Sequence, residues 1–267
     1  MATDPADFWA RRRDLSPPTD SGSAGGDEGK QLMLLADVDS PDLRPAYERT
    51  REDLESFECC TASPFETLHF TVKLFDDVVD GTTVASDAVE RAAGIVARGI
   101  EGVDPFDVEL TQFNLFPDVV YAEVDAGGRL ERLNRRLCAD PAATTLARDG
   151  EGFIPHLTLG YLAGSEGYDS LVTFLENNRE LDFPTLTVAQ VALAVRGVGE
   201  WPPTYDSLAA VTRRRRERYH ESVSGAVPSA EHLPYRGSNG DTPGTHNQYQ
   251  RRERALKLCS LPGFFCG

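Results

Sequence analysis

The sequence predicts an α+β protein with a duplicated bilobal fold, in which two antiparallel-rich sheets with flanking helices surround a central cleft. The first observation is the order of elements, because strand, helix, strand, helix, strand occurs twice between residues 31 and 212. The second is that each copy contains one histidine-bearing apolar strand, with His156 lying 87 residues after His69. Repetition at a fixed spacing indicates internal duplication. Duplicated units of this kind usually pack as two pseudo-symmetric lobes.

The first copy contains, in order, strand 31–39, helix 43–57, strand 67–75, helix 87–101 and strand 107–116. Its strands are apolar runs of strand length, and its helices carry apolar residues at helical spacing. Asp42 offers an N-cap and Pro45 a first-turn residue for the first helix. Ser86 is expected to cap the second helix, which ends at Gly102.

The second copy contains, in order, strand 119–125, a helix around 129–137, strand 152–162, helix 169–179 and strand 186–195. In its first helix, leucines occur at the spacing of one buried face and arginines occupy the other positions. The leucines are Leu130, Leu133 and Leu137. A last strand, 205–211, falls where a third copy would begin.

The two ends of the chain differ from this repeated domain in composition. Residues 1–30 are rich in Ser, Pro, Gly and Asp and are predicted to form a disordered leader. Residues 213–267 hold ten basic and five acidic residues without apolar periodicity, and are predicted to form a mostly disordered basic tail. Such a tail could contact nucleic acid or remain an idle, solvated segment. The predicted domain boundaries are therefore 1–30, 31–212 and 213–267.

The composition restricts the class of protein. No apolar stretch reaches the length of a membrane span, and the N-terminus lacks a signal-peptide pattern, so we expect a cytoplasmic protein without a membrane partner. The five cysteines are odd in number and lack zinc-site spacing, so neither a disulfide framework nor a zinc site is expected. We expect a monomer.

The net charge of −16 would normally argue against a nucleic-acid partner. The chain has only three lysines, however, and this acid-rich, lysine-poor composition is typical of proteins from extreme halophiles. Molar salt shortens the Debye length to about 3 Å. In that setting the global charge says little about the ligand.

The repeated strands contain the candidate catalytic residues. In strand 67–75, His69 and Thr71 lie two residues apart and therefore on one face, and His156 and Thr158 repeat this spacing. A single His-x-Thr could be a buried core histidine, but two copies in matching elements make coincidence hard to sustain. Two imidazoles can serve as base and acid in one displacement, and two hydroxyls can hold phosphate oxygens. No metal is needed, and no ligand spacing suggests one.

The two strands, TLHFTVKLF and FIPHLTLGYL, resemble the signature strands of the two-histidine (2H) phosphoesterase family. Within it they resemble the branch of RNA 2′,3′-cyclic phosphodiesterases and 2′-5′ RNA ligases. The resemblance covers about residues 31–212 and implies a bilobal α+β fold with a central cleft and no cofactor. It also implies hydrolysis of a 2′,3′-cyclic phosphate on an RNA end to a 2′-phosphate, with a possible reverse 2′-5′ ligation.

The resemblance also implies roles for individual residues. His69 and His156 would be the base and the acid, in an order that the sequence leaves open. Thr71 and Thr158 would hold the phosphate oxygens.

Further candidates follow from the alternation of side chains along the strands. Alternation places Lys73 on the face of His69, as a candidate phosphate contact or else a solvated lysine at the strand end. The family's second motif often ends in arginine, but Gly160 and Tyr161 stand here, and Arg196 is a candidate replacement cation. Tyr161 alternates away from His156, which favours a packing role.

Two alternatives to this function stay open. The same chemistry could act on a 2′-5′ oligonucleotide or on a small cyclic nucleotide. The protein could instead bind RNA ends without catalysis, although simple binding would be served better by arginines than by two titratable groups.

Overall fold

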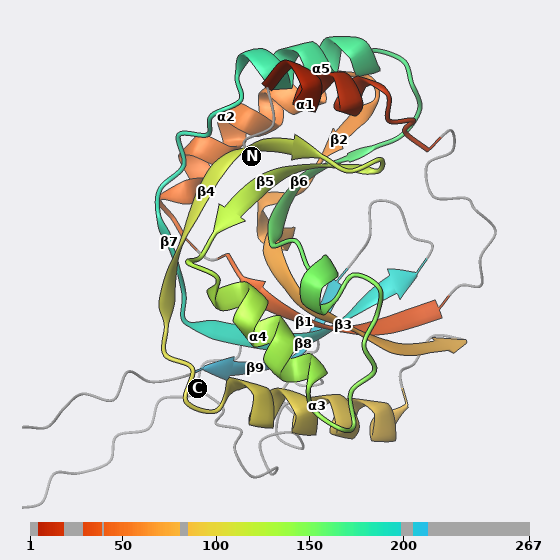
Figure 1. The fold of residues 1–267 in the computed structure, drawn as a ribbon, viewed down its shortest axis with the longest axis vertical. Helices are drawn as coiled ribbons and strands as arrows, with labels where there is room; N and C mark the ends of the chain where they lie inside the picture. Colours follow the sequence, from red (N-terminus) through yellow and green to blue (C-terminus); the bar gives the residue numbers. More distant parts are fainter. Residues whose placement is uncertain (1–4, 19–28, 39, 81–84, 199–204, 213–267) are drawn as a thin grey trace, which may run out of the picture.

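The computed structural model describes residues 5–18, 29–38, 40–80, 85–198 and 205–212. Its core is an antiparallel nine-stranded sheet in the order β7-β4-β5-β6-β3-β1-β8-β9, with β2 paired to β6. Figure 1 shows that this sheet is strongly curled. The strands are β1 (Gly29–Asp37), β2 (Cys60–Ala62), β3 (His69–Asp80), β4 (Phe106–Leu115), β5 (Val119–Asp125), β6 (His156–Leu162), β7 (Leu186–Val188), β8 (Gln190–Val198) and β9 (Tyr205–Thr212).

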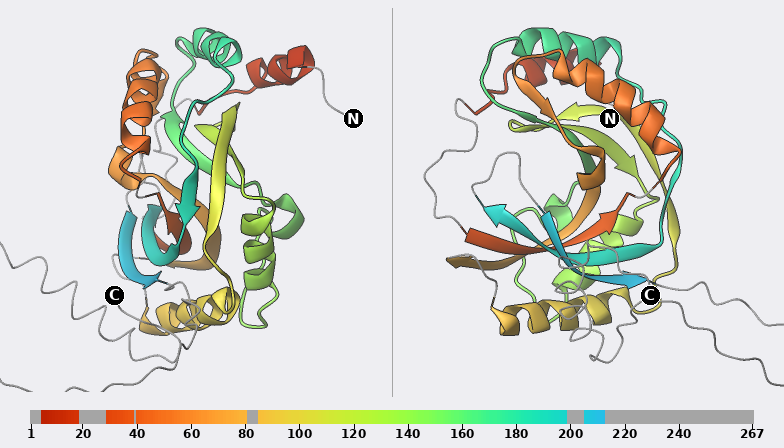
Figure 2. Two further views of the ribbon diagram at one scale, coloured as in Figure 1. Left: turned by 90° about the vertical axis from the view of Figure 1, so that its left-hand side faces the viewer. Right: turned by 180° about the vertical axis from the view of Figure 1, so that it is seen from behind.

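Helices cover one face of each half of the sheet (Figures 1 and 2). The helices α1, α2 and α5 lie over the half that contains β2, β4, β5, β6 and β7, whereas α3 and α4 lie over the half that contains β1, β3, β8 and β9. The helices are α1 (Pro5–Arg13), α2 (Leu43–Glu55), α3 (Ser86–Ile100), α4 (Arg129–Cys138) and α5 (Tyr168–Asn177), with short 3₁₀ turns η1 (Phe65–Thr67) and η2 (Gly150–Gly152). The predicted α+β class, with antiparallel sheet and flanking helices, is confirmed.

The two halves of the sheet each contain strands from both sequence copies. Strand β4 from the first copy pairs with β5 from the second, and β8 from the second copy pairs with β1 from the first. Between the halves, β3 and β6 share one recorded pair, Phe70 with Leu157. The last strand of each copy therefore crosses into the other half.

The main hydrophobic core lies between the sheet and its helices. Helix α4 contributes Leu130, Leu133 and Leu137, as predicted from the leucine spacing, and all three are buried. Because the apolar stripe of an amphipathic helix must be covered, this packing fixes α4 against the sheet and α3.

Several predicted boundaries need correction. The expected strand 186–195 breaks at Ala189 into β7, which pairs with β4, and β8, which pairs with β1, because the chain passes there from one half of the sheet to the other. Asp42 occupies the N-cap position of α2, but its side chain makes no capping hydrogen bond. Ser86 is the first residue of α3 rather than its cap.

The prediction of a disordered leader is wrong for residues 5–18. Helix α1 buries Trp9, which is 1% exposed. The backbone carbonyl of Arg12 accepts a hydrogen bond from the Tyr168 hydroxyl at 2.7 Å, and its side chain donates to Asn114 at 2.8 Å. Phe8 and Trp9 bury enough apolar surface to hold the helix against the domain, although the composition of residues 1–30 as a whole is polar. The predicted tail, 213–267, lies outside the described residues.

Other expectations concern cysteines and membranes. The cysteines within the described ranges, Cys59, Cys60 and Cys138, are free. Across those ranges, no helix combines the length and apolar character that crossing a bilayer requires.

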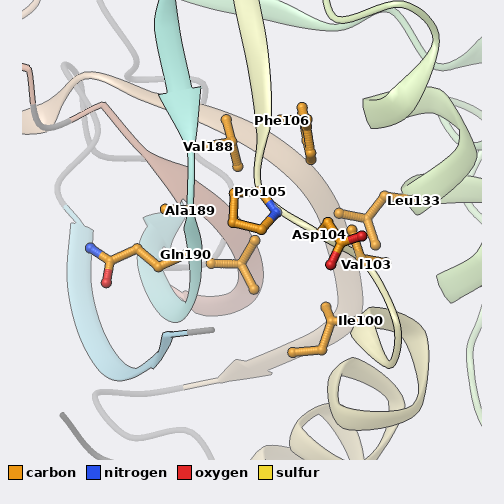
Figure 3. Close-up of a pocket in the computed structure, with 10 residues that line it drawn as sticks. Ile100, Val103, Asp104, Pro105, Phe106, Leu133, Val188, Ala189 and Gln190 are labelled. Carbon is orange, nitrogen blue, oxygen red and sulfur yellow. The ribbon is translucent and has the colours of Figure 1, made fainter. Parts of the chain in front are cut away.

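A small cavity of about 30 Å³ lies beside α3, α4 and the β7–β8 junction (Figure 3). Its lining is mainly apolar and includes Ile100, Phe106, Leu133 and Val191, which belong to the main core. A cavity of this size has room for about one water molecule. Because its lining residues belong to the core between the sheet and its helices, the cavity lies on the side of the sheet that the helices cover.

Candidate active site

The candidate catalytic side chains come from the point where the two halves of the sheet meet. Phe70 on β3 pairs with Leu157 on β6 in antiparallel register. This register sets Thr158 beside His69 and Thr71 beside His156, all on the face opposite to the buried Phe70 and Leu157. The two His-x-Thr pairs therefore lie next to each other at the junction of β3 and β6. We call the face of the sheet that carries His69, Thr71, His156 and Thr158 the histidine face.

Each of these two strands has a β-bulge directly after its His-x-Thr. On β3, Leu34 pairs with Lys73 but Leu35 pairs with Thr71, so Val72 is the extra residue. On β6, Val120 pairs with Gly160 but Tyr121 pairs with Thr158, so Leu159 is the extra residue. The two bulges lie 87 residues apart, at equivalent positions of the repeat. A bulge shifts the alternation of side chains by one residue.

Aromatic side chains pack against both histidines. The ring of Tyr205 lies 4.5 Å from the ring of His69, between centroids. The rings of Phe116 and Tyr121 lie 5.2 and 5.5 Å from that of His156. These contacts restrict the orientation of each imidazole and exclude water from part of it.

Backbone carbonyls fix the tautomer of both histidines. Nδ1 of His69 lies 2.7 Å from the carbonyl oxygen of Thr67, and Nδ1 of His156 lies 2.7 Å from that of Ile154. Because a carbonyl oxygen can only accept, Nδ1 must carry the hydrogen in each case. Nε2 is therefore the nitrogen that gains and loses a proton in both side chains.

Both imidazoles are held in their neutral form. Burial lowers the pKa of His69 from 6.5 to about 4; the Thr67 hydrogen bond opposes this shift, and the charges of His156 and Arg196 add to it. Burial also lowers the pKa of His156, where the Ile154 hydrogen bond opposes the shift and the charge of Arg148 adds to it. At neutral pH each Nε2 can accept a proton.

Two arginines place positive charge near the histidines. Arg196 shares the histidine face with Ala192 and Ala194 of β8, and its Nε donates to Gln31 at 2.9 Å. Its positive charge contributes to the lowered pKa of His69. Arg148 lies in the segment between α4 and β6, and its positive charge contributes to the lowered pKa of His156.

Comparison with known proteins identifies the family. A model of the 2′-5′ RNA ligase superfamily matches residues 39–200. The chain belongs to the 2′-5′ RNA ligase superfamily. The resemblance to 2H phosphoesterases is thereby confirmed, and with it the expectation of an enzyme.

The individual relatives have low sequence identity to this chain. A protein of Methanothermobacter thermautotrophicus named RNA 2′,3′-cyclic phosphodiesterase is 26% identical over 170 residues, which cover 61% of this chain and 88% of that protein. A solved structure of a Thermus thermophilus protein is 18% identical, covers 68% of this chain and 97% of its own, and has a TM-score of 0.48. Escherichia coli LigT with 3′-AMP is 16% identical, covers 71% and 100%, and has a TM-score of 0.47.

The structure contradicts the prediction that Lys73 lies on the same face as His69. Lys73 was expected on the histidine face, but the bulge at Val72 turns its side chain to the side of α4. There it is fully buried, and its Nζ lies 2.6 Å from Oδ2 of Asp149. Its side chain therefore lies on the face opposite to that of Thr71 and is held there by Asp149.

The reason given for a packing role of Tyr161 is also wrong. The bulge at Leu159 brings Tyr161 onto the histidine face, where it packs with Val119 and Tyr121. Its hydroxyl lies 3.2 Å from the hydroxyl of Tyr205 and joins the two halves of the sheet. Gly160 takes the position equivalent to Lys73, and a Cβ there would lie 2.9 Å from Sγ of Cys60. A side chain at position 160 would therefore require Cys60 of β2 to shift.

Sequence reasoning missed two charged residues of the site in this superfamily member. Arg148 lies in an irregular segment, where no periodicity indicates the direction of a side chain. Asp118 lies in the turn between β4 and β5, and its charge acts on both His156 and Arg196. In the part of the chain that the structure describes, no group of three or more His, Cys, Asp or Glu side chains is arranged to hold a metal ion.

Proposed function

We propose that this protein is a phosphoesterase that hydrolyses the 2′,3′-cyclic phosphate at an RNA end to a 2′-phosphate without a metal cofactor. The observation that carries the proposal is the Phe70–Leu157 pair, because it sets both His-x-Thr pairs on one face. The superfamily match and the similarity to a protein named RNA 2′,3′-cyclic phosphodiesterase support RNA as the class of substrate.

The proposed reaction is a single displacement at phosphorus. Neutral Nε2 of one histidine takes a proton from water, and the water oxygen forms a bond to phosphorus. The P–O3′ bond breaks, and protonated Nε2 of the other histidine gives its proton to O3′. The products are a 2′-phosphate and a 3′-hydroxyl, and one histidine has gained the proton that the other lost. A 5′-hydroxyl in place of water would form a 2′-5′ linkage.

The threonines and the environment of the histidines fit this scheme. The hydroxyls of Thr71 and Thr158, half-buried beside the opposite histidine, can donate to the non-bridging oxygens of the phosphate. The lowered pKa values keep a base available at neutral pH. An anionic phosphate between the two imidazoles favours protonation of one of them, which supplies the acid.

The test is incubation of the purified protein with a short RNA that ends in a 2′,3′-cyclic phosphate, with and without EDTA. We expect a 2′-phosphate product at equal rates in both conditions, and no turnover by His69→Ala or His156→Ala. A 3′-phosphate product, or loss of activity with EDTA that added metal restores, would contradict the proposal. Binding without turnover would favour an RNA-end binding protein instead.

Matched substrates separate the enzymatic alternatives. A linear 2′-5′ oligonucleotide and a mononucleoside 2′,3′-cyclic phosphate are compared with the RNA at the same concentration. We expect the highest kcat/KM for the RNA with the cyclic end. A higher value for the 2′-5′ oligonucleotide would reassign the substrate and leave the roles of the histidines in place.

A further inference from the structure

The segment between α4 and β6 is anchored on both sides of the sheet. Leu146 packs against the apolar cluster on the histidine face that contains Met33 and Leu74. Asp149, three residues later, is buried beside Lys73 on the side of α4. The segment thus passes from the histidine face to the side of α4 between Leu146 and Asp149.

A buried polar network holds this segment, and we call Lys73, Asn134 and Asp149 the Lys73 network. Oδ2 of Asp149 accepts from Nζ of Lys73 at 2.6 Å and from the backbone N–H of Leu146 at 2.9 Å. Oδ1 accepts from Asn134 at 3.0 Å. Burial raises the pKa of Asp149, but the hydrogen bonds from Lys73 and Asn134 outweigh it, so the pKa lies below the usual value. The carboxylate is therefore ionised and paired.

The network also reaches the strand of His69. Asn134 on α4 donates to the backbone carbonyl of Val72, the bulge residue, at 2.9 Å, and accepts from the N–H of Gly150 at 2.8 Å. Lys73 donates a second bond to the carbonyl of Thr144 at 2.9 Å. Because buried polar networks with all members paired are rigid, the segment from Thr144 to Gly150 has a defined position relative to β3.

Arg148 lies between the two anchors of this segment and is exposed. It makes no hydrogen bond or ion pair with any residue that the structure describes. Its positive charge acts on His156 and on Arg196, which itself acts on His69. The charges of two guanidinium groups from different elements thus act on the histidine pair and on each other, and this mutual repulsion is relieved when an anion lies between them.

We propose that Arg148 binds a phosphate of the substrate together with Arg196, and that the Lys73 network holds Arg148 in place for this contact. The proposal rests on the proposed function, because an RNA end supplies the phosphate. A guanidinium suits this ligand, since its planar set of donors matches two phosphate oxygens. Arg148 would then supply, from a loop, the cation that Tyr161 does not supply from the strand.

The first test replaces Arg148 by Gln and compares two substrates, a mononucleoside 2′,3′-cyclic phosphate and a dinucleotide with the same end. The control is Arg135→Gln, which removes the same charge from an exposed position on α4. Loss of a charge-assisted hydrogen bond raises KM by about tenfold or more. A rise for both substrates assigns the contact to the cyclic phosphate, and a rise for the dinucleotide alone assigns it to the preceding phosphate. Arg148→Lys should recover part of the loss.

A KM for Arg148→Gln within about twofold of the Arg135→Gln control, with both substrates, would overturn the proposal. A second readout does not depend on turnover. Fluorescence anisotropy measures the affinity of each variant for RNA that ends in a 2′-phosphate, and the slope of log K against log salt should fall by about one unit in Arg148→Gln. Because this assay measures binding alone, it tests the contact of Arg148 even if the proposed reaction does not occur.

The second test concerns positioning by the Lys73 network. The double variant Lys73→Met/Asp149→Leu removes both charges, so that neither remains buried without a partner. We expect its KM to rise as in Arg148→Gln, and we expect Arg148→Gln to add no further rise in this background. Full additivity of the two effects would overturn the positioning role.

Thermal unfolding shows whether the double variant folds. Leu146→Ala, which removes the other anchor and leaves the ion pair intact, provides a second background for the same comparison.

Discussion

Phe70 of β3 and Leu157 of β6 form an antiparallel pair at the junction of the two halves of the sheet. Each is buried in the main core and directly follows a histidine on the opposite face. The same pair therefore ties the core to the site. Its geometry makes the histidine on each strand a neighbour of the threonine on the other, which leads to specific expectations about both.

Replacement of the threonines should show whether their hydroxyl groups contribute to catalysis or whether the side chains only fill space. Thr71→Val and Thr158→Val keep the shape and the strand propensity but remove the hydroxyl. If each hydroxyl stabilises the phosphate in the transition state, kcat should fall by about 10²- to 10³-fold, as for the loss of one oxyanion donor. The serine variants at the same positions keep a hydroxyl and should lose much less. Equal losses in the valine and serine variants would mean that only packing matters.

The lowered pKa values of the histidines predict a pH dependence of stability. The unfolded chain protonates His69 near pH 6.5, whereas the folded protein does so only near pH 4. Between these values the unfolded state binds more protons, so stability is complete above pH 6.5 and declines as the pH falls toward 4. Chemical denaturation from pH 7 to 4 measures this slope, which should be smaller in His69→Gln. An unchanged slope in that variant would contradict the burial of the imidazole.

The Lys73–Asp149 pair should show the asymmetry of a buried ion pair. Lys73→Met leaves the Asp149 carboxylate buried without its cation and should lower the free energy of unfolding by about 3–5 kcal/mol. The double variant Lys73→Met/Asp149→Leu should be more stable than this single variant. Urea unfolding of the wild type and the two variants tests the order. A double variant less stable than Lys73→Met would show that the hydrogen bonds of Asp149 outweigh the cost of its unpaired charge.

Helix α1 should contribute to stability although it lies outside the residues that match the superfamily model. Trp9 is almost fully buried between α1 and the rest of the domain, so Trp9→Ala should cost about 3–5 kcal/mol. Trp9→Phe should cost less, because most of the apolar contact remains. Urea unfolding measures both. A cost below about 1 kcal/mol for the alanine variant would mean that α1 is dispensable.

Much of the site was predictable from the sequence because its key residues lie in regular elements. The spacing of His69 and Thr71, and its repeat at His156 and Thr158, depends only on the two-residue period of a strand and on the duplication. Arg196, proposed from the sequence as a replacement cation, lies on β8, where its charge acts on His69. Lys73 and Tyr161 were misplaced for one shared reason: a bulge inserts one residue, and every side chain beyond it changes face.

The sequence by itself predicted the order of the helices and strands from β1 onward, apart from the short β2 and the break at Ala189, and it predicted the pair of His-x-Thr strands, since these follow from local periodicity and chemical type. The tertiary structure decided which face Lys73 and Tyr161 occupy, where Arg148 lies, and that α1 packs on the domain. Bulges, buried ion pairs and the position of an irregular segment depend on contacts between residues far apart in the chain. At positions 73 and 149, a lysine and an aspartate 76 residues apart became one buried pair, and no local pattern encodes that partnership.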